Sequence, residues 1–317
     1  MKYALILALG CGSVSIAAAE FTLKDDGQGV TVLDKGQPVL TYNYGDIPAP
    51  EEVAGHLTRA TYVHPLYGLD GDVLTEDFPA DHYHHRGVFW SWPNNTVGRE
   101  PLNTWLMDSS HQVFDKWLET SAGATANLAV QNYWSRNDAS DVPIVEEIVK
   151  ITVLPASDMA RAIDFELTFK NVDAEKRTVT ILGAPTDNKG YGGFCIRPVA
   201  ARKPHRFTSA QGTHEKDVLR LDSPWADVTS QIPGQSDYSG TAIFQHPGNP
   251  DYPHKGWILR NYSFLGASWP CLDPCDLAPG ESVTLKYRLL VHRGTAEEAG
   301  VARMYQEYLR GIPEAAE

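Results

Sequence analysis

The sequence lacks an excess of positive charge. Its 317 residues contain 27 Lys and Arg against 40 Asp and Glu, which gives a formal net charge of −13. Because an acidic protein repels nucleic acids and anionic membranes, neither is expected as a partner. Low-complexity tracts, internal repeats and Pro/Ser-rich linkers are missing as well, and 42% of the residues are hydrophobic. This composition predicts a globular chain with a sizeable core.

Long hydrophobic runs are also missing. The apolar run within the N-terminal "MKYALILALGCGSVSIAAAE" is shorter than the ~20 residues that a membrane-spanning helix needs. Lys2 ahead of that run, and the small residues at 17–19, predict a secretory signal peptide over residues 1–19. The alternative is a lipoprotein in which Cys11 carries the lipid. We therefore expect a protein that is exported to the periplasm or the extracellular space and does not span the membrane.

Cysteine is scarce, with four residues in the chain. The three that follow the signal peptide are Cys195, Cys271 and Cys275. Export would permit a disulfide, and Cys271 and Cys275 in "PCLDPCD" are close enough in sequence to close a small loop. Cys195 would then be an unpaired, buried thiol. Half a zinc site is the other interpretation, but the sequence offers no second half nearby.

Glycine and proline are frequent, with 26 and 21 residues, so few long stretches are free of turn residues. This favours many short strands over a helical bundle. Residues 21–45 alternate apolar and polar side chains between two glycine turns, which predicts about three antiparallel strands. Further strands are expected at 84–92, 112–118, 127–135, 144–154, 161–170, 177–183, 191–197, 241–246, 256–260 and 282–292. The predicted fold class is all-β, an antiparallel β-sandwich formed by a single domain over residues 20–317.

One short helix is expected at the C-terminus. Thr295 can cap its first turn, with Glu298 as the partner in a capping box. The apolar residues of one helix face are Val301, Tyr305, Tyr308 and Leu309. Gly311 and Pro313 end the helix, which we expect to pack against the edge of the sandwich.

Residues 81–92, "DHYHHRGVFWSW", bring three histidines within four positions. If the stretch is a strand, its side chains alternate between two faces. One face then carries His82, His84, Arg86, Trp90 and Trp92. Such a face is a poor core, but it suits a sugar, whose rings have apolar faces and hydroxyl rims. A bulge would turn His85 to the same side, so His85 is also a candidate.

Three interpretations compete for this stretch. Imidazoles titrate near neutral pH, so His84 or His85 could move a proton while Arg86 holds a substrate oxygen. A divalent metal could instead be bound by His82 and His84 together with His246. A hydrogen-bonded cluster with only a structural role is the third interpretation. We predict no cofactor, with the metal as the alternative.

Two later stretches add candidate substrate-binding residues. The glycine spacing of "TDNKGYGGFCIRP", residues 186–198, excludes a phosphate-binding P-loop or a dinucleotide fingerprint. Loops such as "FQHPGNPDYPHKGW", residues 244–257, commonly line pockets. The candidates from the two stretches are Asp187, Lys189, Tyr191, Arg197, His246, His254 and Trp257. By contrast, "VEEIVKITV" is expected to be a strand with solvent on one side, on which either Glu146 or Glu147 is simply exposed.

Four motifs carry a family resemblance: "HPLYGLDGDVLTEDFPADHYHHRGVFWSW", "DNKGYGGFCIRP", "HPGNPDYPHKGW" and "SVTLKYRLLVHRG". Together they resemble the bacterial family known as methane oxygenase PmoA-like, over about residues 64–293. The methane monooxygenase subunit of that name crosses the membrane several times, so the name does not describe this chain's chemistry. The resemblance implies an exported protein whose sandwich is similar to the galactose mutarotase type, in a family associated with sugar-oxidising and keto-sugar-processing enzymes.

These observations predict an exported carbohydrate-active enzyme that uses histidine as a general acid or base. It would be a hydrolase, a lyase or an epimerase acting on a glycoside or a modified sugar, with Trp90, Trp92 and Tyr191 stacked on the ring. The second hypothesis is a non-catalytic carbohydrate-binding protein that uses the same face. The third is a metal-dependent oxygenase, as the family name would have it.

Overall fold

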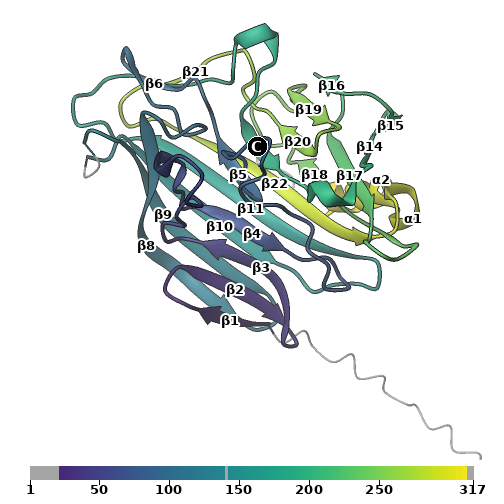
Figure 1. The fold of residues 1–317 in the computed structure, drawn as a ribbon. Coiled ribbons are helices and arrows are strands. Elements are labelled where there is room, and N and C mark those ends of the chain that lie inside the picture. Colours follow the sequence, from purple (N-terminus) through teal and green to yellow (C-terminus); the bar gives the residue numbers. More distant parts are fainter. Residues whose placement is uncertain (1–20, 140–141, 313–317) are drawn as a thin grey trace, which may run out of the picture.

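The structure is a computed structural model that describes residues 21–139 and 142–312. The expected signal peptide, residues 1–19 with Cys11, lies outside the described residues. The described chain forms two large antiparallel sheets, which Figure 1 shows as two layers, with β1 to β4 in purple and blue along one and β8 to β11 in teal along the other. The predicted all-β sandwich is confirmed.

The first sheet has nine strands in the order β1-β2-β3-β4-β5-β13-β20-β19-β16. Its first three strands are the predicted N-terminal hairpins, and β4 lies within a segment where no strand was expected. The bounds are β1 Phe21–Asp25, β2 Gly29–Asp34, β3 Gln37–Asn43, β4 Tyr62–Leu66, β5 Val88–Ser91, β13 Gly193–Ile196, β16 Val218–Leu219, β19 Trp257–Arg260 and β20 Phe264–Ala267.

The second sheet also has nine strands, in the order β15-β14-β17-β18-β22-β11-β10-β9-β8. Its longer strands match the predicted runs, whereas β14, β15 and β17 lie in a segment without a predicted strand. The bounds are β8 Ser110–Ala122, β9 Ala126–Arg136, β10 Val145–Val153, β11 Ala160–Asn171, β14 Arg206–Ser209, β15 Gly212–His214, β17 Trp225–Gln231, β18 Tyr238–Gln245 and β22 Ser282–Arg293.

A small third sheet pairs four short strands in the order β21-β12-β6-β7. Single-turn 3₁₀ helices occur in three loops. The strand bounds are β6 Thr96–Val97, β7 Glu100–Pro101, β12 Val179–Ile181 and β21 Cys275–Leu277, and the 3₁₀ helices are η1 Gly55–Leu57, η2 Thr186–Asn188 and η3 Ala200–Arg202.

The main core lies between the two large sheets. Alternate side chains of each strand point into it, such as Val88 and Trp90 of β5 and Phe165 and Leu167 of β11. The other face of each sheet points outward. Phe89 of β5 therefore belongs to a separate apolar cluster on the outer face of the first sheet, with Trp105 and Phe264.

The C-terminal helical segment packs on the outer face of the second sheet. Thr295 and Glu298 form the predicted capping box, but Gly300 adopts a left-handed conformation and divides the segment into α1 Ala296–Ala299 and α2 Val301–Arg310. Tyr305 packs on Phe244 of β18, with a ring-centroid separation of 5.2 Å. Figure 1 shows both helices in yellow beside β17 and β18.

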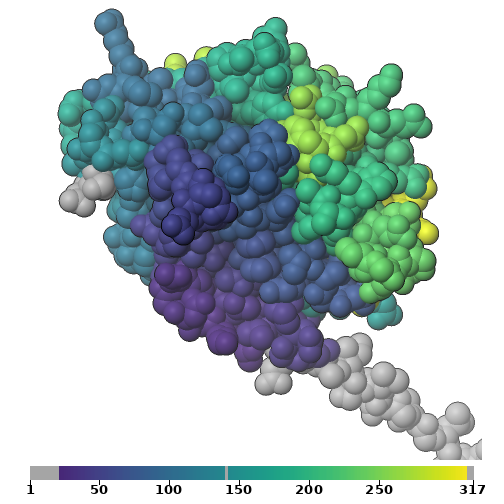
Figure 2. All heavy atoms as spheres, viewed as in Figure 1, coloured from purple at the N-terminus to yellow at the C-terminus, as the bar shows by residue number. Residues whose placement is uncertain are grey.

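A loop segment between β3 and β4 covers part of the surface. Val53 and Leu57 of this segment form a small apolar cluster with Met107, and Ala49 and Phe78 pack against it. Figure 2 shows the segment in dark blue beside the lighter blue residues that follow it in the chain. No helix among residues 21–139 and 142–312 is long and apolar enough to cross a membrane.

Candidate active site

The histidine-rich stretch forms a turn, so the strand predicted to begin at residue 84 begins only at Val88. The amide of His85 donates to the carbonyl oxygen of His82 at 2.8 Å, which closes a β-turn over residues 82–85. Gly87 follows with a φ of 25°, and a side chain there would collide with the Val63 carbonyl oxygen of neighbouring β4. Because of this turn, the predicted alternation of His82, His84 and Arg86 along one strand face is wrong.

The turn gathers the three imidazoles into one cluster. The rings of His82 and His85 are nearly parallel, with centroids 4.8 Å apart, and His84 meets His85 edge-on at 4.5 Å. Tyr262, in the turn between β19 and β20, stacks on His82 with ring centroids 4.6 Å apart and lies 6.3 Å from the His85 centroid. Trp105 lies 5.8 Å from His84.

These rings form the wall of a pocket of about 350 Å³ on the outer face of the first sheet. It combines imidazole, aromatic and cationic side chains from four separate segments of the chain. The lining residues are His82, His84, His85, Pro93, Trp105, Leu106, Ala184, Lys189, Tyr191, Arg260 and Tyr262. We call this the histidine pocket.

Asp81 and Arg197 contact the histidine cluster and orient two of its rings, those of His82 and His85. Nη2 of Arg197, a fully buried side chain, donates to Asp81 Oδ1 at 2.5 Å. Oδ2 of Asp81 lies 3.1 Å from His82 Nδ1, close enough for an ion pair, although the angles are not those of a hydrogen bond. Nη1 of Arg197 lies 3.4 Å from His85 Nδ1. A guanidinium has only donors, so His85 Nδ1 must accept and the proton of the neutral ring lies on Nε2.

Burial keeps two of the imidazoles uncharged at neutral pH. Desolvation, followed by the effects of the neighbouring His82, Arg59 and Arg197, lowers the pKa of His84 to about 4. For His85, desolvation followed by the two neighbouring histidines lowers the pKa well below its usual value. Among the described residues, the contacts of the His84 ring are with His82, His85 and Trp105, and no hydrogen bond to another described residue involves its nitrogens.

Trp90 and Trp92, predicted to stack on a sugar, are wholly buried between the sheets. The ring of Trp90 lies parallel to that of Phe194, and Trp92 Nε1 donates to the Trp269 carbonyl oxygen at 2.6 Å. The two tryptophans do share a face, but that face is the core side of β5. This correction removes both from the set of side chains that a ligand could touch.

Arg86 is also wholly buried, so its predicted contact with a substrate oxygen is wrong. Its guanidinium forms an ion pair with Asp77 and lies between the rings of Phe78 and Tyr62, at 3.5 and 4.4 Å from their centroids. The charge is therefore used to fasten the loop before β5 to β4. Arg197, in contrast, contacts two residues of the histidine pocket, His85 through Nη1 and the ring of Tyr262 at 5.5 Å from its centroid.

The stretch at residues 186–198 is divided between the pocket and the solvent. Lys189 and Tyr191 line the pocket, and Tyr191 Oη lies 3.2 Å from Tyr262 Oη. Asp187 is exposed and pairs with Lys189 Nζ at 2.9 Å.

The candidates from residues 244–257 lie elsewhere. Trp257 is buried in the main core, and its Nε1 donates to the Ser223 carbonyl oxygen at 2.7 Å. His254 Nδ1 accepts from the Gly256 amide at 3.1 Å, within its own loop. His246 lines a different pocket, of about 360 Å³, on the outer face of the second sheet beside α2. The structure therefore does not bring these three residues to the histidine pocket.

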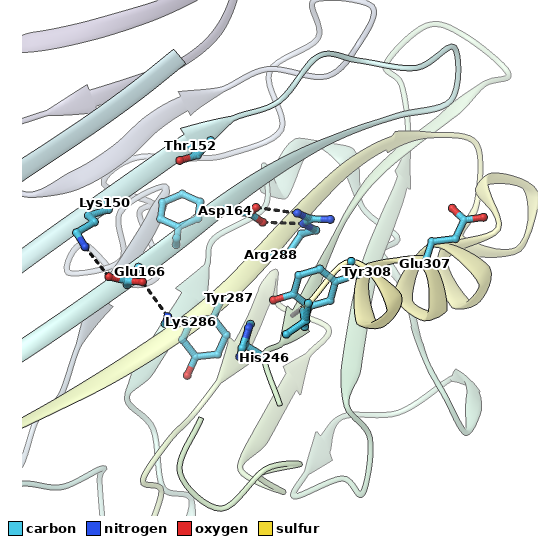
Figure 3. A pocket seen from close by; sticks show the side chains of 13 residues that line it. Lys150, Thr152, Asp164, Glu166, His246, Lys286, Tyr287, Arg288, Glu307 and Tyr308 are labelled. Atoms are coloured by element: carbon cyan, nitrogen blue, oxygen red, sulfur yellow. Dashed lines mark hydrogen bonds and ion pairs between the residues drawn. The ribbon is translucent and has the colours of Figure 1, made fainter. Parts of the chain in front are cut away.

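We call this second pocket the helix groove, and Figure 3 shows its side chains. It lies over β10, β11 and β22, and most of its charged side chains pair with one another. The lining residues are Lys150, Thr152, Asp164, Phe165, Glu166, His246, Lys286, Tyr287, Arg288, Glu307, Tyr308, Gly311 and Ile312.

The alternative metal set of His82, His84 and His246 does not converge, because His246 belongs to the helix groove. Within the part of the chain that the structure describes, no three His, Cys, Asp or Glu side chains are grouped to hold a metal ion. The thiols of Cys195, Cys271 and Cys275 are free, so the Cys271–Cys275 disulfide is not formed in this structure. Cys195 is buried, as expected.

Either Glu146 or Glu147 was expected to be exposed, but Glu146 is half-buried and Glu147 is wholly buried between the sheets. Its carboxylate accepts from Trp134 Nε1 at 2.6 Å, Gln112 Nε2 at 3.0 Å and Asn132 Nδ2 at 3.0 Å. Burial raises its pKa, and these donors act in the opposite direction. Gln112 also accepts from the buried Arg59 at 3.0 Å, so one amide bridges two buried charged groups.

Sequence reasoning missed three main residues of the pocket, Trp105, Arg260 and Tyr262. A signal for Arg260 was present in "WILR", where Trp257 and Leu259 alternate with Ile258 and Arg260. If Trp257 faces the core, Arg260 must face outward. Trp105 and Tyr262 lie in loops, where no periodicity indicates which way a side chain points.

The chain belongs to a protein family of unknown function, DUF6807, which it matches over residues 29–306. This family carries no oxygenase name, and the resemblance to PmoA-like proteins remains a prediction. No curated protein matches the chain.

Several solved structures are similar in fold. A polysaccharide lyase shares 11% identity and a TM-score of 0.37, over 92% of this chain and 34% of its own. The GH36 alpha-galactosidase AgaA from Geobacillus stearothermophilus has 9% sequence identity and a TM-score of 0.34, over 86% of this chain and 40% of its own. A GalM/aldose epimerase homologue from C. elegans has 8% sequence identity and a TM-score of 0.33, over 87% of this chain and 99% of its own. The chain thus spans about a third of the lyase's length, and these likenesses concern the fold alone.

Proposed function

We propose that the protein is an exported enzyme that acts on a glycoside or a modified sugar in the histidine pocket by general acid–base catalysis. One observation carries the proposal: three imidazoles, two tyrosine hydroxyls and a tryptophan ring face the same pocket of about 350 Å³. Pockets of this size hold small ligands, and apolar rings with a few polar groups suit a sugar's faces and hydroxyls.

The aromatic side chains would place the sugar ring. Trp105 and Tyr262 lie on the pocket wall, next to His84 and His82 respectively. The hydroxyls of Tyr191 and Tyr262, 3.2 Å apart, can each donate or accept a hydrogen bond from a ring hydroxyl. This pair replaces the buried Trp90 and Trp92 as the expected sugar contact.

The histidines would divide the proton-transfer roles. His84 is neutral above about pH 4 and has no hydrogen-bond partner among the described residues, so it is the proposed general base. His82, beside the Asp81 carboxylate, is the second proton-transfer group, because a carboxylate at Nδ1 leaves Nε2 for the substrate. His85, fixed by Arg197, offers an Nε2 hydrogen to a substrate oxygen.

The test is a panel of glycosides and keto-glycosides incubated with the purified protein and read by mass spectrometry and NMR. A hydrolase gives products whose summed mass exceeds that of the substrate by one water. A lyase gives products that sum to the substrate mass, and an epimerase leaves the mass unchanged but alters the NMR spectrum. Turnover that persists undiminished in His84→Gln and His82→Gln would contradict the proposal.

A non-catalytic sugar-binding protein is the second candidate, and the low pKa of His84 favours it. An imidazole that stays neutral down to about pH 4 is a good hydrogen-bonding group but lies below the pKa range that suits proton transfer at pH 7. The same panel decides between the two. Saturable binding without any product, with affinity lost in Trp105→Ala, would establish a binding protein.

A further inference from the structure

Arg260 lines the histidine pocket with its hydrogen-bonding capacity unused. The residue ends β19 on the outer face of the first sheet, and its side chain is 20% exposed. Its buried Nε has no hydrogen-bond partner, and no hydrogen bond between described residues uses its guanidinium. The nearest carboxylate oxygen, Asp217 Oδ2, lies 3.4 Å from Nε, and Asp217 Oδ1 accepts instead from the Asn261 amide at 2.8 Å.

Two buried arginines, Arg86 and Arg202, use their guanidinium groups within the fold. Arg86 pairs with Asp77, and Arg202 donates to Asp72 and Ser239 at 2.7 and 2.6 Å. Arginine presents five donors in a planar fork that matches a carboxylate in two parallel hydrogen bonds. Arg260 has an ion pair with Asp217 through Nε alone, so its two terminal nitrogens remain available to receive such a group.

The charges on the pocket wall have one sign. Lys189 and Arg260 are the only lining residues with permanent charge among those described, and no Asp or Glu lines the pocket. Lys189 pairs with the exposed Asp187, while Asp81 is occupied by Arg197 and His82. In a protein with a net charge of −13, a pocket wall with only positive permanent charges is a local exception.

From these contacts we infer that the ligand of the histidine pocket is a sugar acid, whose carboxylate binds Arg260 with Lys189 as a second cation. This inference deepens the proposed function and rests on it for the sugar. The carboxylate would accept two hydrogen bonds from the Arg260 fork, while Tyr262 and Trp105 contact the ring. The carboxylate would also offset the positive charges of Arg59 and Arg197, which lower the pKa of His84, and so make His84 a stronger base when substrate is bound.

The test compares three probes of equal ring type: methyl β-D-glucuronide, methyl β-D-glucoside and glucose 6-sulfate. Binding is measured by titration calorimetry with wild-type protein and with Arg260→Gln, Arg260→Lys and Arg99→Gln. Arg99 is an exposed arginine outside the pocket and serves as the control for loss of one positive charge. Thermal melting verifies that each variant is folded.

We expect the glucuronide to bind at least tenfold more tightly than the glucoside. Arg260→Gln should remove most of that preference, Arg260→Lys should retain part of it, and Arg99→Gln should leave it unchanged. Equal binding of glucuronide and glucoside, or a preference that survives Arg260→Gln, would overturn the inference. Tighter binding of the sulfate than of the glucuronide would also overturn it, in favour of a tetrahedral anion.

The inference and the proposed function can fail separately. Turnover of neutral sugars that depends on His84, without any preference for the glucuronide, would support the proposed enzyme and contradict the inference of a sugar-acid ligand. Binding of the glucuronide through Arg260 without turnover of any uronide would support the inference of a sugar-acid ligand and contradict the proposed enzyme.

Discussion

The histidine pocket and the helix groove have nearly the same volume, about 350 and 360 Å³, and both contain charged, aromatic and histidine side chains. They differ in how those groups are used. In the groove, Glu166 accepts from Lys150 at 2.7 Å and lies 3.0 Å from Lys286, and Asp164 accepts from Arg288 in two bonds of 2.6 and 2.7 Å. Figure 3 shows these pairs along the sheet.

Both pockets place an arginine over a tyrosine ring, with Arg288 4.4 Å from the Tyr308 centroid and Arg260 5.9 Å from the Tyr262 centroid. The pockets differ in their hydrogen bonds, because the Arg260 guanidinium and the His84 nitrogens make none to a described residue. Polar groups that satisfy one another stabilise the fold, whereas polar groups that face a pocket without partners are available to a ligand. This difference, rather than size, is the reason why we propose the ligand site on the first sheet.

The largest expected effect is a difference in kcat/KM between two histidine variants, one in each pocket. His84→Gln should lower kcat/KM by about 10²- to 10⁴-fold, because general acid–base catalysis contributes that much. His246→Gln, in the helix groove, should change kcat/KM by less than about twofold, since His246 has no role in the proposed chemistry. Steady-state kinetics on the substrate found in the glycan panel measure both. Equal losses in the two variants would erase the distinction between the pockets.

The pH dependence gives the next effect. The base must be unprotonated, and the pKa of His84 is lowered to about 4, so the acid limb of kcat/KM should fall near pH 4. An ordinary imidazole with a pKa of about 6.5 would already have lost about tenfold in rate at pH 5.5. A midpoint near 6.5, measured while circular dichroism shows a folded protein, would assign the proton transfer to another group.

Trp105 lines the pocket and is also buried against Phe89 and Phe264, so Trp105→Ala should weaken both ligand binding and stability, whereas Trp92→Ala should weaken stability alone. Trp105→Ala is expected to raise KM by about two- to twelvefold, because an aromatic contact contributes about 0.5–1.5 kcal/mol beyond its buried area. Trp105→Phe, which retains a ring, should recover most of the affinity. In contrast, Trp92→Ala should lower the free energy of unfolding by about 3–5 kcal/mol, as expected for a large side chain in the core. A mere loss of stability in Trp105→Ala with KM unchanged would count against the pocket.

The smallest effect concerns the ion pairs of the groove. Lys286→Gln should reduce the free energy of unfolding by about 0.2–1 kcal/mol, because the Lys286 side chain is partly exposed and its pair is screened by solvent. Urea titration measures this change, and activity should stay within twofold of wild type. A large loss of activity with normal stability would reveal a function for the groove that its internal pairing does not predict.

The fold was largely predictable because strands carry a local signal. Alternation and turn residues located the N-terminal hairpins, most long strands of the second sheet and the capping box at Thr295. The missed strands β14 and β17 lie in a segment whose alternation is weak, since Trp225 and Ala226 are both buried. Two-sided burial removes the alternation on which the prediction depended.

The site was less predictable, for a different reason. Alternation indicates which side chains share a face, but not whether that face meets the core. Trp90 and Trp92 were therefore correctly predicted to share a face, but that face is buried and does not line the pocket. The turn at His82–His85 depends on a backbone hydrogen bond that no residue pattern revealed. Arg260 and Tyr262 lie about 180 positions after His82 in the chain. The pairing of β13 with β20 and of β20 with β19 brings them to the pocket.

The most direct test of the account is a crystal structure of the His84→Gln variant with a bound substrate identified on the glycan panel. The account predicts that the sugar lies in the histidine pocket, against Trp105 and Tyr262, with a ring hydroxyl or the scissile oxygen beside His82 and the substituted residue 84. A sugar bound in the helix groove, or elsewhere with the histidine pocket empty, would contradict it.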